Sequence, residues 1–319
     1  DFWGFISGWG YFVGTVAGNA IILHAFSDLA QKMGFVLPFA HTFSPATSQL
    51  LFDIFFTILF TAINLANITI LERIHVGFTI LKTIPIALVL ISAFFLFDFS
   101  HVIAAPVQPL GLLSSMPIVL FAYLGIEACC AITHQIKDGE KNSARAMLIS
   151  LGIIIAMYSL VQFGLLGIFG AGNTDPFFSI LPKLTSNQSI INLGNLVIKI
   201  AILSSYLGGF YGMFYSNSWN LYAIAKEKKI VFSEALTKLN KYQTPWVSIL
   251  AQAVLVILLL FVARTSVTTL MTMSGLGVVI AYVLSAITYL VIGKKKKISW
   301  RSRLSRKRYT SRPLPERSR

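Results

Sequence analysis

Charged side chains are scarce in this 319-residue chain and make up 12% of it. Soluble domains carry about 25%, so the deficit argues against an ordinary soluble protein. Apolar residues replace them: 55% of the chain is hydrophobic. Several long apolar runs follow one another along the sequence. Each is near or beyond the roughly 20 residues that a membrane-crossing helix needs. The composition therefore predicts an all-α polytopic membrane protein.

Cysteine is nearly absent, because Cys129 and Cys130 are the only two. They are neighbours on one apolar span and point in different directions on a helix, so we interpret them as small packing residues rather than a disulfide. The five histidines have no metal-ligand spacing. The loops contain no nucleophile–base pair and no phosphate-binding loop. We therefore predict no metal, no cofactor and no enzymatic activity.

An initiator methionine and a signal peptide are also lacking, since Asp1-Phe-Trp-Gly leads directly into an apolar span. We expect the chain to begin partway through a longer protein.

Eight apolar spans are expected. They cover residues 2–29, 49–67, 76–97, 112–132, 146–169, 191–223, 247–262 and 266–292. In alternating loops, nine basic residues fall on one side: Arg73, Lys137, Lys141, Arg145, Lys226, Lys228, Lys229, Lys238 and Lys241. Only Lys32, Lys183 and Arg264 fall on the other. Basic loops stay on the cytoplasmic side, so both chain ends are predicted to be cytoplasmic.

Twelve more basic residues lie between Lys294 and Arg319, and they bring the net charge of the chain to +14. A tail of this kind suits either nucleic acid or an anionic membrane surface. We favour the membrane surface, because the tail follows a span directly. Its Arg/Ser/Pro-rich composition predicts disorder; a non-native origin is the alternative. The expected division is a transmembrane core, residues 1–293, and a cytoplasmic tail, residues 294–319, with no nucleic-acid partner.

Two loops were also expected to have structure. The segment 177–182 suits a short helix at the outer surface, and 226–241 suits an amphipathic helix at the inner surface. An ordinary solvated loop is the alternative for both.

The stretch from Met116 to Glu127 differs from a plain membrane anchor. Pro117 lacks an N–H, Gly125 favours an open backbone, and Glu127 places an acid within an apolar span. Unwound backbone at membrane depth is tolerated only where protein covers it or it lines a cavity, and such broken helices form transporter substrate sites. The alternative is a kinked structural helix with an isolated acid.

Three motifs resemble the amino acid–polyamine–organocation transporter superfamily. The first is Phe121-Ala-Tyr-Leu-Gly-Ile-Glu127, followed by a basic loop, Ile136 to Ala146, in which Asp-Gly replaces the usual Asn-Pro. The second is Leu221-Tyr-Ala-Ile-Ala-Lys-Glu227 with Lys238-Leu-Asn-Lys-Tyr-Gln-Thr-Pro245. The third is Trp9-Gly-Tyr11 with Gly18-Asn19. The resemblance implies a leucine-transporter-type inverted-repeat fold, of which the eight spans are family helices three to ten. The first two helices, with half of the expected substrate cradle, are not included.

The resemblance also implies roles for individual residues. The backbone of Phe121, Ala122, Tyr123, Leu124 and Gly125 is expected to bind the substrate amino group through free carbonyls. Tyr123 aligns with an aromatic gate, and Asn19 with a substrate-contacting asparagine. The alternatives are helix packing for Tyr123 and an interhelical hydrogen bond for Asn19. Met213 replaces a tryptophan of the arginine exchangers, which argues against arginine as the substrate.

Two charged residues are expected to couple or gate transport. Glu127 matches a family acid linked to pH sensing or gate closure; a structural hydrogen-bonded acid is the alternative. Lys82 matches a lysine that takes the place of sodium in sodium-independent relatives, while snorkelling to the inner surface is the alternative. Ser204 and Ser205 fall near the sodium site of coupled relatives, and we favour helix packing for them.

The predicted function is secondary active transport of amino acids or related amines by alternating access, coupled to protons or run as an exchange. A sodium-coupled symporter of the same fold, or a channel or receptor without a transport cycle, are the alternatives. The expected partners are a small-molecule substrate and the lipid bilayer, and the expected location is a bacterial plasma membrane. The oligomeric state is open.

Overall fold

The computed structural model describes residues 2–35, 43–66, 68–103, 109–173, 175–228, 230–263 and 267–310. All regular secondary structure within these ranges is helical, which confirms the predicted all-α class. The α-helices are α1 (Phe2–Lys32), α2 (Pro45–Asn64), α3 (Ile68–Leu96), α4 (Phe99–Ile103), α5 (Pro109–Ala122), α6 (Ala128–Ala131), α7 (Gly139–Phe169), α8 (Pro176–Leu184), α9 (Gln188–Lys226), α10 (Ser233–Leu236), α11 (Trp246–Ala263) and α12 (Val267–Thr310). A 3-10 turn, Thr133–Gln135, follows α6.

Each predicted span corresponds to a helix or, in one case, to an interrupted pair. In the described part of the chain, six segments are long and apolar enough to cross a membrane: α1, α2, Arg73–Leu96, Lys141–Phe169, α9 and Val267–Val291. A shorter apolar segment, Trp246–Phe261, lies in α11. The remaining predicted span, residues 112–132, is divided between α5 and α6.

The helix ends follow local sequence signals. Ser44 precedes α2, and its hydroxyl oxygen accepts a hydrogen bond from the Thr47 N–H at 3.3 Å, while Pro45 occupies the first turn, where no intrahelical donor is needed. The Asn187 side chain accepts hydrogen bonds from the first N–H groups of α9. Gly170, with φ +73°, ends α7.

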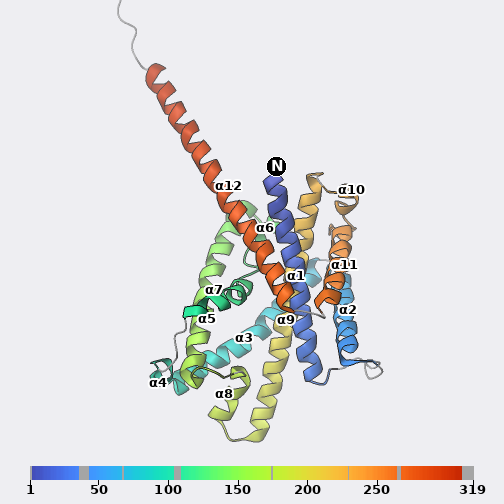
Figure 1. Cartoon of the computed structure of the whole chain (residues 1–319), viewed down its shortest axis with the longest axis vertical. Helices are drawn as coiled ribbons and strands as arrows, with labels where there is room; N and C mark the ends of the chain where they lie inside the picture. The colour runs from blue at the N-terminus through green and yellow to red at the C-terminus, as the bar shows by residue number, and fades with distance from the viewer. Residues whose placement is uncertain are drawn as a thin grey trace, which may run out of the picture.

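Two hydrophobic clusters hold the helices together. The larger joins α1, α2, α9 and α11 around fully buried side chains such as Phe12, Phe210 and Ile249. The smaller joins α3, α7 and α8 around Val89, Leu165 and Ile180. Figure 1 shows α1 and α9 near the centre, α2 and α11 on one side of them, and α3, α7 and α8 on the other. The central helix α1 also packs along α12.

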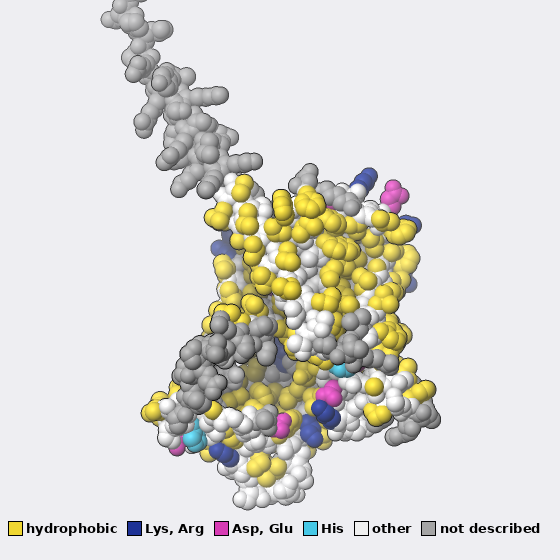
Figure 2. Space-filling model, in the orientation of Figure 1, with side chains coloured by type: hydrophobic (Ala, Val, Ile, Leu, Met, Phe, Trp, Pro, Cys, Tyr) yellow, Lys and Arg dark blue, Asp and Glu magenta, His cyan; other side chains and the backbone are white. Residues whose placement is uncertain are grey.

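The outer surface of the bundle is apolar. Large hydrophobic side chains of α3, α7 and α9 are exposed, among them Phe94, Leu148 and Leu193. Figure 2 shows hydrophobic side chains over most of one face, with the few charged side chains gathered toward its two ends. A surface this apolar is expected where lipid tails, rather than water, surround the helices.

Two of the loop predictions have different outcomes. Helix α8 confirms the short helix predicted around residues 177–182. The amphipathic helix predicted for residues 226–241 is wrong over most of its length, since in the described part of this segment only Lys226, the last residue of α9, and α10 are helical. Lys228 and Phe232 adopt left-handed conformations with φ 55° and 61°, which interrupt a right-handed helix.

Helix α12 continues to Thr310, into the segment predicted as a disordered tail. Residues 311–319 of that tail lie outside the described residues.

Candidate functional site

The membrane helix that begins at Pro109 is interrupted after Ala122. Residues 123–127 form turns, and the chain becomes helical again at Ala128. Gly125 has φ +100°, a conformation that side-chain-bearing residues rarely adopt, so it allows the backbone to leave the helix. The predicted interruption is therefore present. It lies at Gly125, while Pro117 remains inside α5.

The interruption changes which backbone groups are hydrogen-bonded. The Phe121 carbonyl accepts from the Leu124 N–H at 3.2 Å, and the Ala122 carbonyl accepts from the Tyr158 hydroxyl at 3.1 Å. The Gly125 carbonyl accepts from the Ala128 N–H at 3.1 Å. Among the described residues, the carbonyl oxygens of Tyr123 and Leu124 accept no hydrogen bond. These two oxygens can therefore bind an external donor such as an ammonium group.

Glu127 ties the interruption to two other helices. Its Oε1 accepts a hydrogen bond from the Tyr11 hydroxyl at 2.9 Å, and its Oε2 accepts one from the Tyr282 hydroxyl at 2.8 Å. The Gly125 N–H also points at the carboxyl group, 3.2 Å from Oε2 and 3.3 Å from Oε1. One acid thus joins α1, α12 and the unwound segment. Hydrogen bonds to a charged acceptor stabilise more than neutral ones, which offsets part of the cost of placing this acid among apolar helices.

Glycines allow the two tyrosine-bearing helices to approach each other closely. A Cβ added at Gly14 would lie 2.9 Å from the Ser274 carbonyl oxygen, and one added at Gly277 would overlap the Gly10 carbonyl oxygen. The backbones of α1 and α12 therefore meet without side chains between them. Small residues at such spacings are typical of helix pairs that pack closely in membranes. This close approach brings Tyr11 and Tyr282 to the same carboxyl group.

Four elements converge near Gly18 on α1. A Cβ added there would lie 3.0 Å from the Ser274 hydroxyl oxygen of α12, 3.6 Å from Met213 Cε of α9 and 3.7 Å from a ring carbon of Phe121. A Cβ added at Gly125 would lie 3.8 Å from Met213 Cγ. The unwound segment and the centre of α1 thus share a neighbour, Met213. The structure therefore brings together two distant sequence motifs, Phe121–Glu127 and Gly18-Asn19.

Asn19 follows Gly18 and is fully buried. In the described part of the chain neither its amide nitrogen nor its carbonyl oxygen has a hydrogen-bond partner, and the Ser274 hydroxyl is also buried without one. Buried polar groups are normally paired because leaving them unpaired costs free energy. The interhelical hydrogen bond considered for Asn19 is therefore not made, and its amide remains available to a ligand.

Tyr123 lies against α7. Its ring centroid is 5.5 Å from that of Tyr158, in an edge-to-face arrangement, so here its ring packs against another aromatic. Phe121, two residues earlier, is the aromatic side chain that approaches Gly18 and packs against the larger hydrophobic cluster.

Lys82 lies away from this centre, exposed on α3. The face of α3 that bears His75 and Phe78 meets α9, because a Cβ added at Gly212 would contact the His75 ring and one added at Gly208 would contact Phe78. The next turn of α3 carries Lys82.

No group of three histidine, cysteine, aspartate or glutamate side chains that could hold a metal ion occurs in the described ranges. A shallow, open pocket of about 530 Å³ borders the chain just after the interruption. Its lining includes Cys130, Thr133 and His134 but not Glu127, so this cavity lies beside the hydrogen-bonded centre rather than in it.

A profile of the family described as amino acid permease matches residues 1–314. The chain belongs to the amino acid permease family. The chain is 24% identical over 301 residues to the serine/threonine exchanger SteT of Bacillus subtilis, covering 93% of this chain and 66% of SteT. It is 26% identical over 310 residues to the aromatic amino acid transport protein AroP of Salmonella typhimurium, covering 90% of this chain and 62% of AroP. The chain thus spans less than two thirds of the length of either relative.

Several site residues of the permease were not predicted from its sequence. Tyr11 and Tyr282 hold Glu127, yet a tyrosine in an apolar span resembles any packing aromatic. Asn240, within the second family motif, donates from its amide to the Leu65 carbonyl at 3.0 Å. Its side-chain oxygen accepts from the N–H groups of Tyr242 and Thr244. This asparagine therefore fixes the loop before α11 to the end of α2.

The departure from the family motif at Asp138-Gly139 has a structural reason. Asp138 adopts a left-handed conformation with φ 49°. A Cβ at Gly139 would overlap the carbonyl oxygen of Thr133. Any residue with a Cβ, proline included, would push this carbonyl away, so glycine allows the loop to fold back on the 3-10 turn.

Proposed function

We propose that this permease transports amino acids or related amines by alternating access, and that the substrate binds where the interrupted helix faces α1. The proposed ligands are the carbonyls of Tyr123 and Leu124 for the substrate amino group, the Asn19 amide, and an apolar wall formed by Phe121 and Met213. The observation that carries the proposal is the pair of carbonyl oxygens without hydrogen bonds beside a glycine with φ +100°.

Glu127 is proposed to keep the site closed on the cytoplasmic side. Tyr11 precedes Gly18 by seven residues, about 10 Å at the usual helical rise. With the start of α1 at the cytoplasm, as the distribution of basic loops predicts, the Tyr11–Glu127–Tyr282 contacts lie between the site and the cytoplasm. Opening toward the cytoplasm then requires these hydrogen bonds to break, while the outer route is independent of them.

Coupling is proposed to be independent of sodium. Lys82 lies one turn beyond Phe78, which packs on Gly208 of α9. Its ammonium is proposed to take the place of a cation, as the resemblance to sodium-independent relatives implies. Proton coupling and exchange of internal for external substrate are both compatible with this arrangement. The sodium-coupled alternative requires uptake that rises with external sodium. If uptake by a Lys82→Gln variant becomes dependent on sodium, this result would support the idea that the Lys82 ammonium takes the place of a sodium ion.

Uptake of labelled amino acids into proteoliposomes tests the proposal. Because the similar proteins are named for serine/threonine exchange and aromatic amino acid transport, these substrates are the first to try. We expect uptake to saturate with substrate concentration. If the protein is an exchanger, amino acid preloaded inside the proteoliposomes should accelerate this uptake. Absence of uptake and exchange for all amino acids would contradict the proposal, and unsaturable flux would instead indicate a channel.

A matched pair of glycine variants links uptake to the interruption. Gly125→Ala forces a side chain into a left-handed conformation, and we expect uptake to fall by about five- to thirtyfold, since such strain costs roughly 1–2 kcal/mol. Gly152→Ala, in the middle of α7, adds a Cβ with no atom within 4 Å and is expected to leave uptake unchanged. Equal uptake by both variants would separate transport from the interruption.

A further inference from the structure

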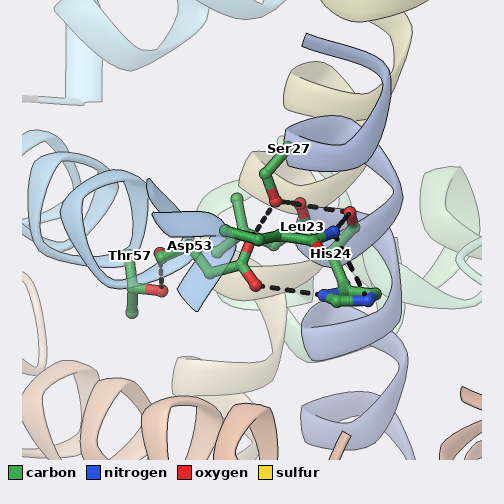
Figure 3. A network of polar contacts seen from close by, with 6 residues as sticks. Leu23, His24, Ser27, Asp53 and Thr57 are labelled. Atoms are coloured by element: carbon green, nitrogen blue, oxygen red, sulfur yellow. Dashed lines mark hydrogen bonds and ion pairs between the residues drawn. The ribbon is translucent and has the colours of Figure 1, made fainter. Parts of the chain in front are cut away.

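A second polar network lies between α1 and α2, away from Glu127 (Figure 3). His24 Nδ1 lies 3.1 Å from Oδ2 of Asp53, which belongs to α2. The Ser27 hydroxyl donates a hydrogen bond to the other carboxyl oxygen, Oδ1. The Ser27 hydroxyl also lies 2.9 Å from the Leu23 carbonyl, and Thr57 donates to the Asp53 carbonyl at 2.8 Å. Both side-chain oxygens of Asp53 therefore have a partner, and one partner is an imidazole.

The two members of the pair differ in exposure. The Asp53 side chain is 2% exposed, whereas that of His24 is 23% exposed. A carboxylate this deep among apolar helices is costly unless a positive charge accompanies it. His24 is the partner that can supply one. Its other nitrogen, Nε2, lies 3.5 Å from the Gln49 amide at the less buried edge.

Few other charges act on this pair. Asp28, one turn after His24 on α1, interacts with the ring electrostatically and is itself bound to Lys32 at 2.7 Å. Tyr206 of α9 also interacts with Asp28. In the described part of the chain, Asp53 and Asp28 are the acids that act on the His24 ring.

We propose that His24 and Asp53 form a proton-binding site, separate from the Glu127 centre, through which pH acts on α1 and thereby on substrate binding. Proton binding by the pair is independent of the proposed transport function, whereas its effect on substrate binding rests on that function.

The proton is taken up and released through His24. A proton from water adds to Nε2 of an imidazole that already carries one on Nδ1, and the Nδ1–H stays directed at Asp53 Oδ2. The pair is then imidazolium and carboxylate, with no net charge. When Nε2 loses the proton to water, the Asp53 charge remains in an apolar setting without a full counter-charge. Because histidine changes charge between about pH 5 and 8, and two coupled groups titrate as a unit, the stability of the α1–α2 contact should depend on pH.

Helix α1 connects this pair to the proposed substrate site. Asn19 lies five residues before His24, about 7.5 Å along the helix. Both residues lie on the same unbroken helix, which packs against α2, α9, α11 and α12. A shift of α1 relative to α2 therefore moves Asn19 relative to the interrupted helix.

A double-mutant cycle over a range of pH tests proton binding without any transport assay. Melting temperatures are measured for the wild type, His24→Gln, Asp53→Asn and the double variant in detergent. We expect coupling between the two positions that is large at low pH and falls as the pH rises through the histidine range. His24→Lys keeps its positive charge above the histidine range, so this variant should retain at high pH the coupling to Asp53 that the wild type shows only at low pH. Coupling that does not change with pH would overturn the proposal and leave a structural hydrogen bond.

The pH dependence of substrate uptake tests the link to transport. A single linked proton changes an equilibrium by up to about tenfold per pH unit, and we expect His24→Gln to lose this dependence. Asp28→Asn removes a half-exposed acid that acts on the His24 ring only electrostatically, so this variant should keep the dependence, displaced toward lower pH. Dependence that persists in His24→Gln would overturn the link. If no variant transports amino acids, the proposed function fails, while the melting experiment still decides whether the pair binds a proton.

Discussion

The hydroxyl of Tyr282 lies 2.8 Å from Oε2 of Glu127, across 155 residues of sequence. Tyr11 occupies the other carboxyl oxygen at 2.9 Å. One side chain at the end of the unwound segment therefore holds α1 and α12 together. An acid that sequence patterns mark as out of place in an apolar span is thus held by three donors, two of them on distant helices.

Replacing Tyr282 with phenylalanine should loosen this junction. Loss of a hydrogen bond to a charged group costs about 1.5–3 kcal/mol, so amide exchange in residues 123–127 should accelerate about ten- to hundredfold when measured by hydrogen–deuterium exchange mass spectrometry. Tyr289→Phe is the control, because Tyr289 lies on the same helix, 78% exposed. Unchanged exchange in Tyr282→Phe would mean that the other donors alone hold Glu127.

The glycines of α12 offer a second, sterically based test. Gly277→Ala places a Cβ against the Gly10 carbonyl, so α12 must move away from α1. We expect a loss of roughly 1–3 kcal/mol in the free energy of unfolding, as overpacking usually costs, together with faster exchange at residues 123–127. Gly275→Ala, two residues away, meets no atom within 4 Å and should be neutral or slightly stabilising. Similar melting temperatures for both variants would contradict the close approach of the backbones.

Asn240 should be important for stability although it lies outside the membrane spans. Asn240→Ala removes three side-chain hydrogen bonds that join the loop before α11 to the end of α2. At about 1 kcal/mol each, the expected loss is roughly 1–3 kcal/mol, measured by thermal unfolding. Asn240→Asp keeps the acceptor oxygen but not the donor to Leu65, so its loss should be smaller. A larger loss for the aspartate would point to its charge rather than to hydrogen bonding.

Asp98 should give the protein a small dependence on acid pH. Hydrogen bonds from the backbone and side chain of Ser100 lower the pKa of the Asp98 carboxyl group below its ordinary 3.8, and the charge of His101 lowers this pKa further. Because the folded state then binds the proton less readily than the unfolded state, the carboxylate stabilises the fold above pH 3.8, and this contribution is lost as the pH falls through the lower folded value. The melting-temperature difference between wild type and Asp98→Asn should therefore shrink on acidification from pH 6 toward pH 3. A constant difference would contradict the shift.

The sequence predicted features that depend on local composition. The apolar spans, the position of the interruption and the short helix α8 all follow from runs of apolar residues, one glycine and short polar boundaries. Glu127 could be singled out because an acid is rare in such a run. These signals lie within the segments that they describe.

Features that depend on contacts between distant segments could not be predicted. Tyr11 and Glu127 are 116 residues apart, and nothing in either segment points to the other. The same holds for His24 and Asp53, which lie 29 residues apart on different helices. The helix predicted over residues 226–241 was too long for a local reason, since the left-handed backbone at Lys228 and Phe232 is not signalled by glycine or asparagine.

Helix α9, with 39 residues, is about 58 Å long at the usual helical rise. Even tilted by 40°, the upper end of the common range, it would extend about 44 Å along the membrane normal, against a hydrocarbon thickness of about 30 Å. At least about 14 Å of this helix must therefore stand among the lipid headgroups or in water. Since α8 and α10 adjoin its two ends, a thicker bilayer that reduces the tilt of α9 would also change how deeply these short helices lie.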